Sequence, residues 1–105
     1  MPKEIVVLIT APSLREARTI GKRLVEEKLA ACANIIPQVA SVFFWQGKIC
    51  RERESLMLLK TRQSCFDRLV KRVKSLHSYS VPEIIALPII RGSKDYLRWI
   101  HRTTR

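Results

Sequence analysis

The chain has 105 residues, the size of one domain and too short for a second independent core. Its composition, 47% hydrophobic and 28% charged with only 3 Gly and 5 Pro, excludes a disordered or fibrous protein. The formal net charge of +11 attracts anions in general without selecting one of them. We therefore predict a single domain over residues 1–105 and infer no function from charge alone.

Strand and helix signals open the chain. Glu4–Thr10 is an apolar run rich in β-branched residues, which predicts a strand. Ser13 follows Pro12 and has Glu16 three residues later, the spacing of a capping box at a helix N-terminus. Apolar residues then recur at helical spacing, with charged residues on the other faces. We predict a helix from this cap to about Leu29.

A long hairpin is predicted next. Residues 31–36 and 39–45 read as extended segments, and Pro37 between them cannot donate to a sheet and so marks a bend or an edge. The Gln-Gly-Lys sequence at 46–48 is the predicted tip. The return arm over residues 51–61 begins polar and becomes apolar, so we expect the outer end of the hairpin to reach solvent or a neighbour.

The second half predicts a helix, a strand and a last helix. Ser64 is placed to cap the second helix, whose apolar stripe ends at His77. After a loop over residues 78–82, residues 83–90 predict a strand, and Ser93 opens a short helix. The side chains of this last helix expected to face inward are Tyr96, Leu97 and Ile100.

The predicted order is β-α-β-β-α-β with an extra C-terminal helix, an α/β (α+β) sandwich of the ferredoxin-like kind. In that architecture helices cover one face of an antiparallel sheet, so the strands should alternate apolar and polar residues. Ile5–Ile9, Leu56–Leu59 and Ile84–Leu87 are instead apolar on both faces. If half of those side chains were exposed to solvent, each would lose roughly 1.5–3 kcal/mol of burial free energy. The total loss would exceed the stability of a typical domain. We therefore expect copies of the chain to associate.

Five segments can be read together in this order: Ile9–Pro12, Leu29–Pro37, Trp45–Lys48, Leu59–Thr61 and Val81–Ile89. Taken together, they resemble the CutA family of divalent-cation tolerance proteins. The resemblance extends to residues 96–100 in the last helix and so covers nearly the whole chain. It implies a ferredoxin-like subunit in a tight homotrimer, with long hairpins joining neighbouring sheets, and a similarity to PII signalling proteins that bind small effectors between subunits.

The resemblance also implies a metal site at His77 and Glu83, because the matching residues in the family are implicated in binding copper or similar ions. Cys32 is a third candidate ligand, although a lone cysteine in an alanine-rich strand is usually a small buried hydrophobe. Ile9 stands where some members have a soft cysteine ligand. We expect copper or another divalent metal to bind weakly and no cofactor to be required. The alternative for His77 is a helix-terminal imidazole satisfied by nearby carbonyl groups.

Two further departures lie in the loop after His77. The family segment usually reads His-Pro-Tyr-Glu-Val-Pro-Glu, whereas this chain has Ser78 and Ser80 at the proline and the first glutamate. The polar or amphipathic residues of the matching segments, which could line a cleft between subunits where a small anionic effector meets the lysine, are Trp45, Lys60, Thr61, Tyr79 and Glu83. The alternative is interface packing, with the tryptophan docked on a neighbouring subunit.

Two other functions are weighed against this one. A basic module that binds anions or nucleic acid through phosphate contacts fits the charge, but the central strands lack the aromatic residues on which bases stack, so we expect no nucleic-acid partner. An acylphosphatase-like enzyme would have only Arg15 and Asn34 as candidates, without a glycine-rich phosphate cradle. We expect no enzymatic activity. The short apolar runs also predict no membrane partner.

The sequence also bears on the compartment. Residues 1–4 do not show the cationic, apolar and small-residue order of a signal peptide. The cysteines at 32, 50 and 65 are odd in number and form no C-x-x-C pair, which is typical of free thiols in a reducing environment. The expected location is the cytoplasm.

Overall fold

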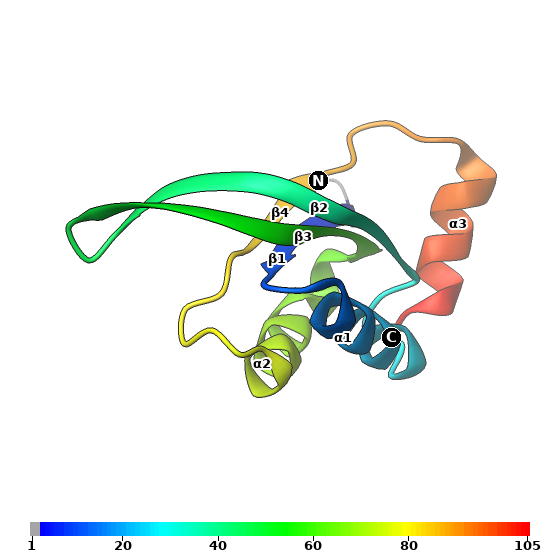
Figure 1. The fold of residues 1–105 in the computed structure, drawn as a ribbon. Coiled ribbons are helices and arrows are strands. Elements are labelled where there is room, and N and C mark those ends of the chain that lie inside the picture. The colour runs from blue at the N-terminus through cyan, green and yellow to red at the C-terminus, as the bar shows by residue number, and fades with distance from the viewer. Residues whose placement is uncertain (1–2) are drawn as a thin grey trace.

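The structure, a computed structural model, describes residues 3–105. The element order confirms the predicted βαββαβ domain with an extra C-terminal helix (Figure 1). The elements are β1 (Glu4–Ala11), α1 (Leu14–Glu26), β2 (Cys32–Trp45), β3 (Lys48–Arg62), a 3₁₀ turn (Gln63–Cys65), α2 (Phe66–Leu76), β4 (Ile84–Pro88) and α3 (Lys94–Thr103).

The four strands form one antiparallel sheet in the order β2-β3-β1-β4, and α1 and α2 lie against one of its faces (Figure 1). The core lies between them, because alternate residues of the strands face the helices and are buried. Its fully buried members include Val7, Ile9, Ile20, Leu24, Met57, Leu59, Leu69 and Val73.

Within residues 3–105, no helix layer lies over the centre of the other face of the sheet. Side chains of β1 and β3 that point this way, such as Leu8 and Leu58, are half-buried. On the flanking strands Ile36, Ile85 and Leu87 remain 43%, 50% and 52% exposed. The sequence prediction that this face is apolar is confirmed, and what covers it stays a prediction.

The hairpin of β2 and β3 extends beyond the rest of the sheet, as predicted. β1 pairs with β3 only from Ser55 onward, whereas β2 and β3 remain paired out to Trp45 and Lys48. The predicted bend at Pro37 is a register shift between Ile36 and Val39.

Both residues at the tip of this hairpin, Gln46 and Gly47, have positive φ, of 50° and 79°. These are the dihedral signs of a tight hairpin turn. The predicted tip is therefore confirmed.

Helix ends differ from the sequence prediction in two places. Ser13 caps α1, its Oγ accepting from the Glu16 amide at 3.1 Å, but the helix ends at Glu26, earlier than expected, because the chain turns at Lys28 with a φ of 60°. Ser64 does not cap α2: it lies inside the 3₁₀ turn, and α2 begins at Phe66 without a side-chain cap.

The last strand and helix show two more differences. β4 spans five residues, shorter than the predicted 83–90, and ends at Pro88, which has no amide hydrogen with which to extend the ladder. Ser93 caps α3 as predicted, and Ile100 is fully buried. Tyr96 was expected to face inward but is 43% exposed, and its hydroxyl lies 3.6 Å from the Cys32 sulfur instead.

Candidate functional site

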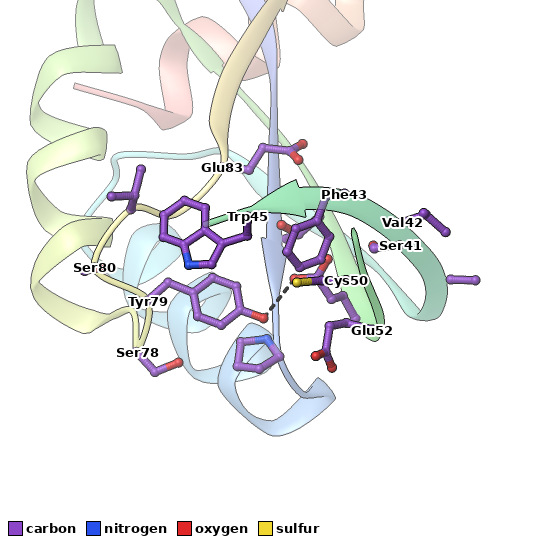
Figure 2. Close-up of a pocket in the computed structure, with 15 residues that line it drawn as sticks. Ser41, Val42, Phe43, Trp45, Cys50, Glu52, Ser78, Tyr79, Ser80 and Glu83 are labelled. Carbon is purple, nitrogen blue, oxygen red and sulfur yellow. Dashed lines mark hydrogen bonds between the residues drawn. The ribbon is translucent and has the colours of Figure 1, made fainter. Parts of the chain in front are cut away.

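The candidate site is a surface groove between the hairpin and the loop that joins α2 to β4 (Figure 2). Its volume of about 980 Å³ is at the upper end of the roughly 300–1,000 Å³ of small-molecule sites. The residues that give it its chemistry are Phe43, Trp45, Glu52, Glu54, Tyr79 and Glu83, and we call it the acidic groove.

The charge of the acidic groove opposes that of the chain. Three of the nine Asp and Glu residues line it, and among the described residues no lysine or arginine does, although the chain has 20 of them. The glutamates come from β3 and from the residue before β4, whereas the aromatic rings of Phe43 and Trp45 come from β2. The groove is therefore an acidic surface on a strongly basic chain.

Glu54 and Tyr79 connect the two walls of the groove. The Tyr79 hydroxyl donates to Glu54 Oε2 at 2.9 Å, and Glu54 is only 6% exposed. Burial, this bond and the neighbouring carboxylates raise the pKa of Tyr79 from 10.0 to about 12. The hydroxyl consequently stays protonated and acts as a donor throughout the neutral range.

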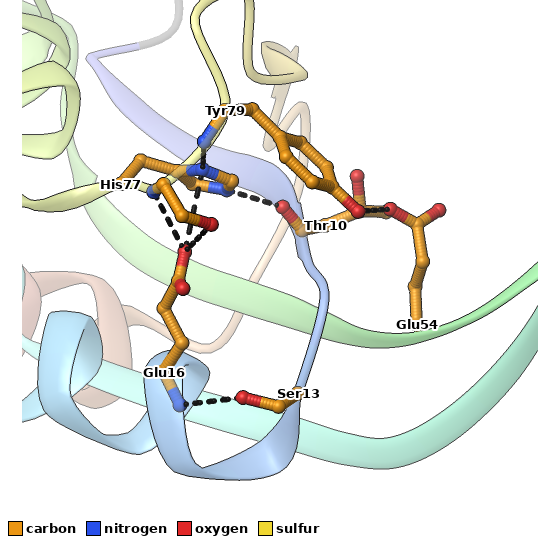
Figure 3. A network of polar contacts seen from close by, with 7 residues as sticks. Thr10, Ser13, Glu16, Glu54, His77 and Tyr79 are labelled. Carbon is orange, nitrogen blue, oxygen red and sulfur yellow. Dashed lines mark hydrogen bonds and ion pairs between the residues drawn. The ribbon is translucent and has the colours of Figure 1, made fainter.

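His77 lies beside this groove and belongs to a hydrogen-bond network that reaches the groove through Tyr79 (Figure 3). It follows the last residue of α2, as predicted, and its side chain is buried. The ring Nε2 lies 2.7 Å from the Thr10 carbonyl oxygen, and Nδ1 accepts from the Tyr79 amide at 3.0 Å. These partners select the neutral tautomer with its proton on Nε2, because a carbonyl needs a donor and an amide needs an acceptor.

Glu16 and Ser78 close the same network. One oxygen of the Glu16 carboxylate accepts from both the amide and the hydroxyl of Ser78, each at 3.0 Å, and lies 3.4 Å from His77 Nδ1. A proline at position 78, as in the usual family segment, has no amide hydrogen for the first of these bonds. The serine found here therefore fastens the loop to the first turn of α1.

The residues predicted as metal ligands are not brought together. Cys32 pairs with Lys60 on β3, whereas Thr10, which contacts His77, pairs with Leu56. Glu83 is exposed at the acidic groove, and His77 has both nitrogens engaged by the protein. Among residues 3–105 no three His, Cys, Asp or Glu side chains lie close enough to hold one ion. This donor arrangement does not fit a tightly held metal, which normally has three or four protein ligands.

The residues predicted to line a cleft between subunits are also not brought together in one place. Trp45 and Tyr79 line the acidic groove, but Lys60 bonds to Asn34 and Thr61 is fully buried, its hydroxyl donating to the Leu29 carbonyl at 2.6 Å. The anion that was expected to meet the lysine therefore has no basic partner at this groove. Of the two residues considered for an enzyme, Asn34 accepts this lysine bond, and Arg15 is exposed in the first turn of α1.

Phe43, Glu52 and Glu54 were not predicted as site residues. A signal existed in the return arm, where arginines at 51 and 53 alternate with glutamates at 52 and 54. Successive residues of a strand point to opposite faces, so this alternation separates the two charges. Which face would meet the α2–β4 loop depends on the curvature of the hairpin, and the alternation does not encode that.

The fold and this groove define a ferredoxin-like, PII-like α/β domain with an acidic surface groove. Residues 5–103 match the family described as CutA1 divalent ion tolerance protein. The divalent-cation tolerance protein CutA of Thermus thermophilus is 54% identical over 101 residues, 96% of this chain and 98% of that protein. Its solved structure superposes with a TM-score of 0.95 at 53% identity, covering 97% of this chain and 99% of the other. The chain belongs to the CutA1 divalent ion tolerance family.

Relatives from other sources share this similarity. The structure of the periplasmic divalent cation tolerance protein CutA from Archaeoglobus fulgidus matches with a TM-score of 0.94 and 48% identity, covering 97% of this chain and 99% of that one. The chloroplastic CutA of Arabidopsis thaliana is 46% identical over 96% of this chain, which spans 56% of the plant protein.

Neither the fold nor these relatives fix the compartment. None of the helices within residues 3–105 has the length and apolar character needed to cross a membrane. Relatives named for a compartment are periplasmic or chloroplastic, so the cytoplasmic location stays a prediction.

Proposed function

We propose that this protein contributes to divalent-cation tolerance as a homotrimer that binds cations at the acidic groove. The family match supports the role in tolerance. The observation that carries the binding proposal is the groove itself, where three glutamates and no basic side chain gather on a chain of net charge +11.

Two apolar surfaces support the trimer. One is the uncovered sheet face, with Ile85 and Leu87 half exposed. The other is the outer face of the hairpin, where Phe44 and Ile49 pair across the strands and are 68% and 59% exposed. Burying each such side chain contributes roughly 1.5–3 kcal/mol. A hairpin of one subunit against the sheet of the next is a head-to-tail contact, which closes into a ring when the rotation between subunits allows it. The family resemblance supplies the number three.

Light scattering tests the assembly. The expected mass is three times the 12.2 kDa of one chain, and Leu87→Glu is expected to dissociate the complex because it puts a charge on the covered face. Thr19→Glu, on the exposed side of α1, is the matched control and should leave the mass unchanged. A folded wild-type monomer would contradict the proposal.

We further propose that copper or another divalent metal binds weakly, with micromolar or poorer affinity and fewer than three ligands from one subunit. Glu83 is the exposed carboxylate expected to contribute, and His77 contributes only if its ring gives up the Tyr79 amide. Calorimetric titration with copper should therefore lose affinity in Glu83→Gln. His77→Ala should also weaken copper binding if the ring ligates the metal, and unchanged affinity in both variants places the metal elsewhere.

A second candidate function is anion binding through phosphate contacts on the helix layer. The outward side of α1 and α2 is rich in exposed basic residues, and it is a different surface from the acidic groove. The exposed basic residues there include Arg18, Lys22, Lys71 and Lys74. Affinity for a phosphate polymer should then fall steeply with salt, and Lys71→Ala should reduce that slope.

A further inference from the structure

The outward side of α1 and α2 carries much of the positive charge of the chain. The two helices lie side by side against the sheet (Figure 1). Together they have eight Lys or Arg residues and three Asp or Glu residues, which gives a net charge of +5. Six of the cations are exposed and form no ion pair within residues 3–105, and we call them the basic helix face. They are Arg15, Arg18, Lys22, Arg23, Lys71 and Lys74.

The spacing of these cations is unfavourable for the protein alone. Arg15, Arg18 and Lys22 follow one another three and four residues apart, and Lys71 and Lys74 are three apart, so like charges are neighbours on each helix surface. Arg15 also lies in the first turn of α1, where the helix dipole disfavours a cation. The exposed carboxylates of the two helices form no ion pair among the described residues. Local costs that no contact within the chain offsets are typical of a functional surface.

The density of these cations favours a polyanion over a small anion. Arg15 and Lys22 are seven residues apart, which corresponds to about 10 Å along the helix axis. A nucleic-acid duplex presents roughly six phosphate charges over that length, because it carries one charge per about 1.7 Å. Several phosphates can therefore contact the two helices at once, and each contact releases bound counterions.

The side chains that are missing from this face distinguish between polyanions. None of the exposed large hydrophobic residues lies on α1 or α2, both of which the structure describes in full. Single-stranded nucleic acid is bound largely by stacking its bases on aromatic rings, and a helix on a membrane surface buries apolar side chains in the lipid. Contact with a duplex backbone requires neither. The expectation of no nucleic-acid partner was based on the lack of aromatic residues for stacking, so it does not bear on duplex binding.

We infer that the basic helix face binds the phosphate backbone of double-stranded nucleic acid without reading its sequence. This inference rests on the second candidate function proposed above, because it names the phosphate polymer that the helix layer takes. The basic helix face lies on the opposite side of the sheet from the uncovered sheet face. An assembly that covers the uncovered sheet face therefore leaves the basic helix face accessible.

Fluorescence anisotropy with a labelled DNA duplex provides the test. Binding should be saturable, and the logarithm of the association constant should fall linearly with the logarithm of the salt concentration. Arg18→Gln/Lys22→Gln should weaken the affinity at least about tenfold at about 0.1 M salt and reduce this slope by about 2, because two phosphate contacts are lost. Lys94→Gln/Arg102→Gln removes the same charge from exposed positions of α3. This matched control should bind as tightly as the wild type.

Several results would overturn the inference. They are the absence of saturable duplex binding, equal weakening by the two double variants, an unchanged slope in Arg18→Gln/Lys22→Gln, and tighter binding of a single strand than of the duplex. An anionic membrane is the rival partner, and vesicles of phosphatidylcholine and phosphatidylserine test for it. Vesicle binding that depends on Arg18 and Lys22, without duplex binding, would assign this face to a membrane surface.

Inorganic polyphosphate separates this inference from the function on which it rests. Binding of polyphosphate through Lys71 without binding of the duplex defeats only the nucleic-acid inference. Binding of neither polymer defeats the anion-binding function as well. Light scattering tests the homotrimer independently of both.

Discussion

The Tyr79 hydroxyl donates a 2.9 Å hydrogen bond to Glu54, joining the loop before β4 to the part of β3 that extends beyond the sheet. The tyrosine lies only two residues after His77, whose ring accepts the Tyr79 amide at 3.0 Å. One residue thus connects the buried network at the end of α2 to the wall of the acidic groove. We therefore expect a substitution in the buried network to affect the groove wall, and a substitution in the groove wall to affect the network.

The first prediction concerns the ionisation of Tyr79. The folded protein holds its proton more tightly than the unfolded chain, with a pKa of about 12 against 10.0. The stabilising effect of this tyrosine is therefore complete below pH 10 and is lost as the pH rises from 10 toward 12. Tyrosinate absorbance measures the titration, and Tyr79→Phe identifies the curve by leaving Tyr96 alone.

The variant Glu54→Gln tests what causes the raised pKa of Tyr79. Burial is the largest cause of the raised pKa of Tyr79, and the bond and charge of Glu54 come next. The variant should lower this pKa without returning it to 10.0, because burial remains. A Tyr79 titration that is the same in both proteins would show that the Glu54 bond is not formed in solution.

The second prediction concerns His77. Replacing it with alanine removes a buried ring and leaves the Thr10 carbonyl and the Tyr79 amide without their partners. We expect a loss of about 2–4 kcal/mol in the free energy of unfolding, measured by urea denaturation. His101→Ala is the matched control, since that residue is exposed on α3, and it should cost less than about 0.5 kcal/mol. Equal losses of stability in the two variants would show that the hydrogen-bond network of His77 does not stabilise the fold.

A third prediction concerns the attachment of the C-terminal helix. Arg62 donates to the Thr104 hydroxyl at 2.8 Å and to its carbonyl at 2.7 Å, fixing the end of α3 to β3. Arg62→Ala should destabilise the fold by about 1–3 kcal/mol and speed amide hydrogen exchange in α3 before other elements. Arg102 is exposed on the same helix, and Arg102→Ala is therefore the control variant. Unchanged protection of α3 in Arg62→Ala would contradict this role.

A fourth prediction concerns the hairpin tip. Gly47 has a φ of 79°, a backbone conformation that a side chain disfavours, and an added Cβ would meet no atom within 4 Å. Gly47→Ala should therefore cost about 1 kcal/mol through backbone strain alone. Thermal unfolding measures the loss, with Lys48→Ala as the neighbouring control. Equal stability of the two variants would mean that the turn relaxes at no cost.

The element order and the face of each strand that enters the core could be predicted from the sequence, because apolar spacing is a local property. Ser13 and Ser93 were identified as caps for the same reason, since a cap depends on residues within one helical turn. The prediction that Ser64 caps α2 was wrong because the chain after β3 forms a 3₁₀ turn there. The packing of Phe66 and Leu69 against the core sets where α2 begins.

The sequence by itself determined the family, the ferredoxin-like order of elements and the apolar character of both faces of the sheet. Only the tertiary structure decided which polar residues meet. It separates Lys60 and Cys32 from Glu83 and places Glu54 beside Tyr79, 25 residues away in the chain. The physical reason is that the curvature of a long hairpin and the path of a loop depend on packing between distant segments, which no local spacing of residues encodes.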